Sequence, residues 1–271
     1  MSNDGLNELR LALDERNLAH VLSAVALAAL VTGIAKARPA ETMCWWCRGG
    51  FVARTAISKT VLFDAASRFL QDMRWIPGFG TVEQGTFAAN GELGSNPFIS
   101  LAEDGQENSP FKTFSGQQGP GNVLGEQQVA LEGLLTTNSW LIQVSRGISS
   151  WGFDCRVGSN AYDLGFSSND EGTGERDPVF PAVELLSVAG ASFFSAIQGW
   201  QVDEKTVGYC IWTEPISVAL ASYAVVGRLH GLPARHYRAK SRGGAYGKGA
   251  AYRFFPEATL RNQKGEQEWQ V

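Results

Sequence analysis

Cysteine, histidine and charge are all scarce in this 271-residue sequence, which has four cysteines, three histidines and only 18% charged residues. Four cysteines in a chain of this length do not form a disulfide framework, so we expect a reducing, cytoplasmic environment. Hydrophobic residues make up 44% of the chain. This balance is typical of a folded globular protein and excludes a disordered one.

A long, strongly apolar segment is also missing. The longest apolar stretch, residues 18–34, is interrupted by His20, Ser23 and Thr32, and acidic residues precede it at Asp14 and Glu15. A signal peptide needs a basic start, and a membrane span needs about 20 strongly apolar residues. We therefore predict a buried core helix here and no membrane contact.

The hydrophobic spacing predicts an α+β fold of mixed helices and short strands, joined by long Gly/Pro-rich loops. The 31 glycines support frequent turns, and the polar stretch 167–177 suggests a boundary between an N-terminal α+β region (1–166) and a C-terminal helical region with a basic tail (178–271). The two regions could also form one continuous domain. We expect helices at 6–36 (with a break near Asn17), 64–75, 127–135, 182–194 and 216–229, and strands at 44–47, 51–55, 139–144, 150–157, 206–213 and after 253.

No residue pattern indicates catalysis, a metal or a cofactor. Cys44 and Cys47 have the spacing of half a zinc site, but Cys155 and Cys210 stand alone and far away. Buried structural cysteines are the simpler interpretation. His20 falls in an apolar helix, which favours a core histidine over a catalytic base. A G-x-S-x-G elbow is absent, and the glycine-rich run at 243–249 lacks the spacing and the final Ser or Thr of a phosphate loop.

Positive charge is concentrated near the C-terminal end. Residues 228–264 contain nine cations and one acid, Glu257, so this segment carries +8 while the rest of the chain carries −12. Tyr237 and Tyr246 are interleaved with the cations. Basic side chains neutralise phosphates and aromatic rings stack on unpaired bases. Either this segment contacts nucleic acid, or it is a solvated basic face or a surface for an acidic partner. The predicted phosphate contacts are Arg235, Arg238, Lys240, Arg242, Lys248 and Arg253.

A second candidate is the polar loop at 109–120. It combines one cation with hydroxyls and side-chain amides on a backbone stiffened by Gly and Pro. Glutamine amides can read base edges, and Lys and Ser suit phosphate oxygens. An ordinary polar loop over the core is the alternative. The candidate contacts are Lys112, Ser115, Gln117 and Gln118.

The same loop, with Lys112 and the segment 114–118, resembles a segment of the accessory large-subunit-like proteins of type I CRISPR systems, from the subtype formerly called uncharacterised. The resemblance extends to the apolar helix at 18–30, to segments 62–64 and 181–186 with Gly190, and to 212–216. These matches are short and are spread over most of the chain.

The resemblance implies a non-catalytic subunit of an RNA-guided surveillance complex of the Cascade kind, acting in antiviral defence. Its expected partners are guide RNA, target DNA, other Cascade subunits and a separate helicase-nuclease recruited on target binding. Reading the target-adjacent motif is a role of large subunits in that family, although this chain is short for one. Two alternatives stay open: a small hydrolase or transferase that uses the glycine-rich loops, and a purely structural protein-interaction module.

Overall fold

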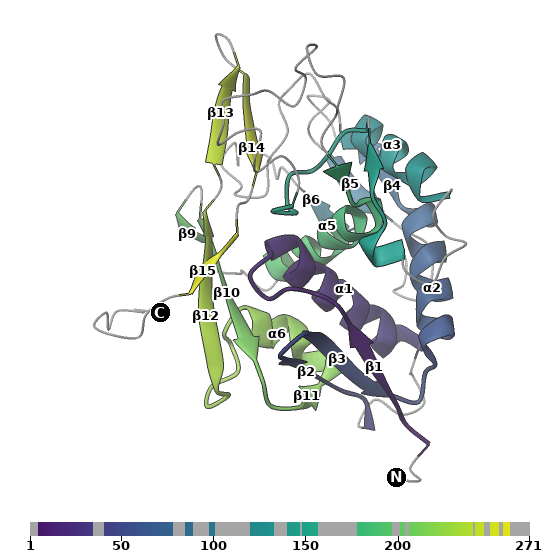
Figure 1. Ribbon diagram of the computed structural model, residues 1–271, viewed down its shortest axis with the longest axis vertical. Coiled ribbons are helices and arrows are strands. Elements are labelled where there is room, and N and C mark those ends of the chain that lie inside the picture. The colour runs from purple at the N-terminus through teal and green to yellow at the C-terminus, as the bar shows by residue number, and fades with distance from the viewer. Residues whose placement is uncertain are drawn as a thin grey trace.

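The computed structural model describes residues 5–34, 41–77, 85–88, 98–100, 120–132, 140–146, 148–156, 178–196, 201–203, 206–240, 242–246, 250–254 and 257–260. Its fold is α+β, as predicted. Helices lie between several small sheets (Figure 1), and every strand pairing among the described residues is antiparallel.

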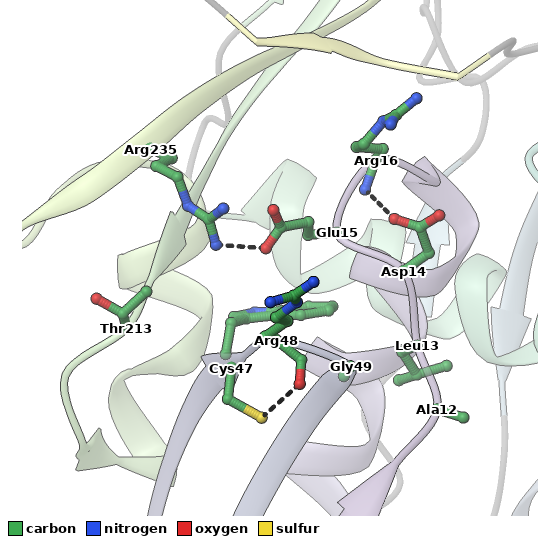
Figure 2. Close-up of a pocket in the computed structure, with 12 residues that line it drawn as sticks. Ala12, Leu13, Asp14, Glu15, Arg16, Cys47, Arg48, Gly49, Thr213 and Arg235 are labelled. Carbon is green, nitrogen blue, oxygen red and sulfur yellow. Dashed lines mark hydrogen bonds and ion pairs between the residues drawn. The ribbon is translucent and has the colours of Figure 1, made fainter.

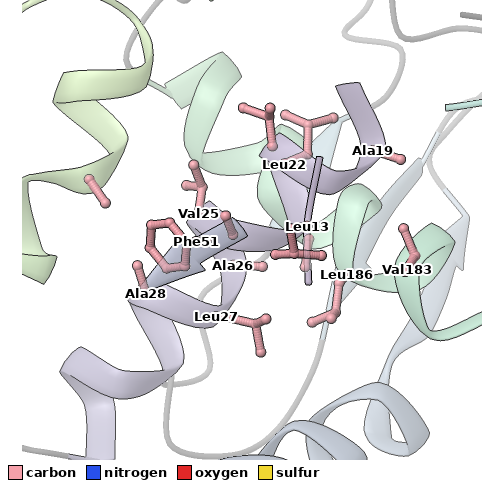
Figure 3. Close-up of a cluster of buried hydrophobic side chains, with 14 of the residues drawn as sticks. Leu13, Ala19, Leu22, Val25, Ala26, Leu27, Ala28, Phe51, Val183 and Leu186 are labelled. Carbon is pink, nitrogen blue, oxygen red and sulfur yellow. The ribbon is translucent and has the colours of Figure 1, made fainter. Parts of the chain in front are cut away.

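The core is built on helix α1 (Leu18–Ile34), which is buried on all sides over most of its length. A helix that is apolar all round must be surrounded by protein, and α5 (Pro181–Ala196) supplies much of the cover (Figure 3). The one buried hydroxyl of α1, Ser23 Oγ, donates to the carbonyl of Val183 at 3.0 Å. The prediction of a buried core helix is thus confirmed. None of the helices in the described part of the chain has both the length and the apolar character needed to cross a bilayer.

Gly190 determines how closely α1 and α5 approach each other. A Cβ atom built on Gly190 would lie 1.9 Å from the carbonyl oxygen of Leu22. Real Cβ atoms essentially never come that close to backbone, so only glycine fits this crossing. The glycine that follows the 181–186 segment therefore has a packing role.

One sheet joins strands from the first 55 residues to a strand that lies far along the sequence. Its strands run in the order β1 (Asn7–Leu11), β3 (Gly50–Thr55), β2 (Met43–Cys47) and β11 (Ile216–Ser217). The β2–β3 hairpin turns at Gly49 and Gly50, whose φ angles of 102° and 146° favour glycine. Because β11 follows the predicted boundary at 167–177 and β2 precedes it, both predicted regions contribute to one sheet, and α1 and α5 contribute to one hydrophobic cluster.

A second sheet holds part of the basic segment, including Arg235, Arg238 and Lys240. Its order is β15 (Thr259–Leu260), β12 (Ala234–Lys240), β10 (Thr206–Trp212) and β9 (Gln201–Asp203). The hairpin of β13 (Arg242–Tyr246) and β14 (Ala250–Phe254) stands beyond the end of β12 (Figure 1). The described residues of the basic segment are therefore mostly β-structure.

Helix α6 (Ala221–Val225) lies between α1 and β10, next to the 3₁₀ turn Val218–Leu220, and α2 (Lys59–Asp72), α3 (Pro120–Glu132) and β4 (Arg74–Pro77) lie across α1 from it (Figure 1). The remaining elements are β5 (Gly85–Ala88), β6 (Phe98–Ser100), the 3₁₀ turn Trp140–Ile142, β7 (Ser145–Arg146) and β8 (Pro178–Val179). Strands β4, β5 and β6 form a sheet of their own.

Some predicted elements were wrong. Residues 7–11 form a strand, because the alternating burial of Leu9, Leu11 and Leu13 has the two-residue period of a sheet. The predicted strand at 139–144 begins as a 3₁₀ turn, and 150–156 is irregular. The predicted helix at 216–229 is a short strand, a 3₁₀ turn and one five-residue helix. The predicted linker at 167–177 lies outside the described residues.

Candidate nucleic-acid interface

The structure describes half of the ten predicted nucleic-acid contacts. Arg235, Arg238 and Lys240 lie on β12, and two more occupy hairpin positions, where Arg242 pairs with Phe254 in register and Arg253 pairs with Gly243. The other five lie outside the described residues. They are Lys112, Ser115, Gln117, Gln118 and Lys248.

Strand β12 divides its cations between its two faces. Side chains alternate along a strand, so Arg235 shares a face with buried Tyr237, whereas Arg238 and Lys240 share the opposite face. Two residues of an antiparallel strand advance by about 6.8 Å. This spacing lets Arg238 and Lys240 contact successive phosphates of an extended single strand. Cations that are close together in the sequence therefore do not form one continuous patch on the surface.

Arg238 has unused hydrogen-bonding capacity. Its Nε is buried and donates to no acceptor among the described residues. Lys240, next on the same face, is exposed. A buried guanidinium N–H without a partner is costly, but this Nε has no exposed surface, so it is not itself a contact point for a bound anion.

The loop between β1 and α1 is fastened to the second sheet through Glu15. The Glu15 carboxylate accepts hydrogen bonds from Arg235 Nη2 at 2.5 Å and from Tyr237 Oη at 2.8 Å. Tyr209 Oη donates to the Glu15 carbonyl at 2.8 Å, and its ring stacks on that of Tyr237. One residue further on, the Arg16 side chain forms an ion pair with Glu257, and the Arg16 carbonyl accepts a hydrogen bond from Ala258 N. Arg235 is thus already paired with a carboxylate.

A cleft of about 720 Å³ opens beside this junction (Figure 2). One wall is the β1–α1 loop, the second is the β2–β3 turn, and the third is the end of β10 with Arg235 of β12. The lining is mixed in character, with three arginines, two acids, an indole and a hydroxyl. The lining residues are Ala12, Leu13, Asp14, Glu15, Arg16, Trp46, Cys47, Arg48, Gly49, Gly50, Thr213 and Arg235.

A buried polar network holds the β1–α1 loop from below. Asn17 caps α1, because its Oδ1 accepts from Ala19 N at 3.1 Å, and its Nδ2 donates to Asp154 Oδ1 at 2.7 Å. His20 Nδ1 accepts from Asp14 N at 2.8 Å, which places the proton on Nε2, 3.9 Å from Asp154 Oδ2. Burial lowers the pKa of His20 to about 4. The prediction of a core histidine is therefore confirmed, and its neutral form holds the loop.

Two buried carboxylates complete this network. Burial alone would raise the pKa of Asp154, but hydrogen bonds from Arg156 and its charge lower it below the usual value. Glu184 of α5 has no such cation among the residues that the structure describes, and burial raises its pKa to about 7. Its oxygens accept from the backbone N–H groups of Trp151 at 2.7 Å and Asp154 at 3.0 Å. The two acids therefore fasten the irregular segment 150–156 between α1 and α5.

The cysteines do not form a reactive or metal-binding group among the described residues. Cys44 and Cys47 are three positions apart on β2 and so point to opposite faces. Cys210 Sγ lies 3.4 Å from His236 Nδ1 across the β10–β12 pair. Cys210 is fully buried, however, and burial raises the pKa of its thiol to about 12. A catalytic cysteine needs the opposite shift.

Comparison of the chain with family models, with curated proteins and with solved structures found no match.

The sequence interpretation missed the β1–α1 loop and the β2–β3 turn as parts of one site. Glu15, Arg16 and Arg48 are far in sequence from Arg235, so composition does not connect them. A weak local signal exists: Arg48 directly precedes the Gly49-Gly50 pair, and a charged Asp14-Glu15-Arg16 break precedes an apolar helix. Binding residues often lie on loops that a rigid scaffold holds in place.

Proposed function

We propose that this chain is a non-catalytic cytoplasmic subunit of an RNA-guided CRISPR surveillance complex of the Cascade kind. Its basic C-terminal strands contact guide RNA, target DNA or both, and its acidic body docks on neighbouring subunits. Sequence recognition in such complexes is delegated to base pairing, while protein binds backbone and reads the target-adjacent motif. Cleavage belongs to a separate helicase-nuclease. The resemblance to large-subunit-like proteins supports this assignment.

The observation that carries the proposal is strand β12. It presents Arg238 and Lys240 on one face, at a spacing suited to successive phosphates, within a segment of charge +8 in an otherwise acidic chain. Arg242 and Arg253 continue the basic character onto the β13–β14 hairpin.

Salt dependence of binding tests this assignment. Each phosphate contact on a single strand contributes about −0.7 to the slope of log affinity against log salt. The double variant Arg238→Ala with Lys240→Ala should therefore flatten the slope for a single-stranded RNA by about 1.4. The matched control is Arg68→Ala with Arg74→Ala, which removes two exposed cations from α2 and β4. Equal slopes for the two variants would contradict the proposal.

The hydrolase alternative has one specific pair to consider, Cys210 with His236. Its buried, high-pKa thiol argues for packing instead of nucleophilic attack. The interaction-module alternative predicts no affinity for nucleic acid at any salt concentration, so the same titration separates it from the proposal.

A further inference from the structure

We infer that the cleft between the β1–α1 loop, the β2–β3 turn and Arg235 binds one unpaired nucleotide of the bound strand. This inference rests on the proposed function and assigns it a subsite. The cleft volume of about 720 Å³ lies within the range of small-ligand pockets. Its walls are held by the hydrogen bonds of Glu15 and His20, so it is formed before any ligand enters.

Arg48 is the cation that remains available in this cleft. Arg235 is paired with Glu15, and Arg16 is paired with Glu257. Arg48 is exposed and has no partner among the described residues, and it lies between Glu15 and Gly49 in Figure 2. With these two ion pairs set aside, the charges left in the lining are Arg48 and Asp14, so the positive charge is local to the wall that carries Arg48. An anionic group is therefore the complement of this wall.

The β2–β3 turn lets that anion come close to the backbone. A Cβ built on Gly49 would meet nothing within 4 Å, and its φ of 102° disfavours any other residue. The turn therefore presents open space directly beside the Arg48 side chain. A phosphate group fits such a glycine-lined position next to a guanidinium.

The remaining lining suits a nucleobase rather than a second anion. Leu13 and Trp46, which are 4% and 1% exposed, form an apolar floor under the cleft, and Thr213 adds a hydroxyl. A base carries an apolar ring with hydrogen-bonding groups at its edge, so it can lie over this floor and bond to the hydroxyl. The cleft also includes Arg235 of β12, which lies on the opposite face of that strand from Arg238 and Lys240, so the cleft is a contact separate from those two residues.

Binding of a labelled eight-nucleotide single-stranded RNA to the full chain tests the subsite, with adenosine monophosphate and inorganic phosphate as competitors. We expect adenosine monophosphate to compete much better than phosphate. Arg48→Ala should weaken octamer binding about tenfold and abolish that competition, while Arg48→Lys should retain part of both. Arg68→Ala, an exposed arginine on α2, is the matched control.

The outcomes separate the subsite from the proposed function. If Arg238→Ala with Lys240→Ala weakens octamer binding but Arg48→Ala behaves like Arg68→Ala, the subsite is wrong and the function stands. Competition by phosphate as strong as by adenosine monophosphate also overturns the subsite, because the base is then not recognised. An octamer that does not bind the wild-type chain overturns both.

Discussion

At the scale of single residues, burial shifts the proton affinities of His20 and Glu184 in opposite directions. His20 has its pKa lowered to about 4 and Glu184 has its pKa raised to about 7, in both cases chiefly by burial. Both groups position backbone: His20 holds Asp14 of the cleft wall, and Glu184 holds segment 150–156. The network therefore couples the shape of the cleft to protonation.

The two shifts have opposite effects on stability. Between pH 4.5 and 7 the folded state binds a proton at Glu184 more tightly than the unfolded state does, so this contribution falls as pH rises. Between pH 4 and 6.5 the unfolded state binds more protons at His20, so that contribution rises with pH. Where the two pH windows overlap, the free energy of unfolding therefore has contributions from Glu184 and His20 that change with pH in opposite directions.

Glu184→Gln should remove the opposing contribution of Glu184, so that the contribution of His20 to the pH dependence of stability becomes visible. We expect the free energy of unfolding of this variant to rise more steeply with pH between 5 and 6.5 than that of the wild type, by up to about 1.4 kcal/mol per pH unit. His20→Asn, which keeps an acceptor for Asp14 N, should move the slope in the opposite direction. Urea unfolding at several pH values measures both, and parallel pH profiles for all three proteins would refute the account.

At the scale of elements, local sequence patterns predicted the helices and strands whose structure does not depend on contacts with residues far away in the sequence. Helices α1 and α5 have long apolar runs, and the β2–β3 hairpin is marked by Gly49-Gly50. Strand β1 was mistaken for helix because Leu6, Leu9 and Leu13 also fit helical spacing, and only pairing with β3 decides between the two. Segment 150–156 is irregular because Glu184, about 30 residues away, binds its backbone. A contact between residues that are far apart in the sequence produces no pattern in the sequence around either of them.

The close crossing of α1 and α5 gives a prediction for Gly190→Ala. The new methyl group would collide with the backbone of Leu22, so we expect a loss of about 1–3 kcal/mol in the free energy of unfolding, as for overpacked cores. Gly125→Ala on α3 is the matched control, because nothing lies within 4 Å of its added Cβ. That variant should gain about 0.5–1 kcal/mol from helix propensity. Denaturant titration compares the two, and equal effects would contradict the packing role.

At the scale of the whole molecule, the charge is separated between an acidic body and a basic segment. The basic cations were predicted from composition, but their division between the two faces of β12 was not, because a list of residues carries no strand orientation. The cleft combines β1–α1, β2–β3 and β12, and only the folded chain shows this combination. An acidic body with one basic segment suits a subunit that docks on protein neighbours and presents part of that segment to nucleic acid.

The central claim is that the chain belongs to an RNA-guided complex, and native co-purification tests it most directly. The chain is expressed together with the products of its neighbouring genes, purified at low salt, and any bound RNA is sequenced. We predict repeat-derived RNAs of uniform length with other subunits in fixed ratio, and loss of that RNA at high salt. A monomer free of RNA and of partner subunits would contradict the claim.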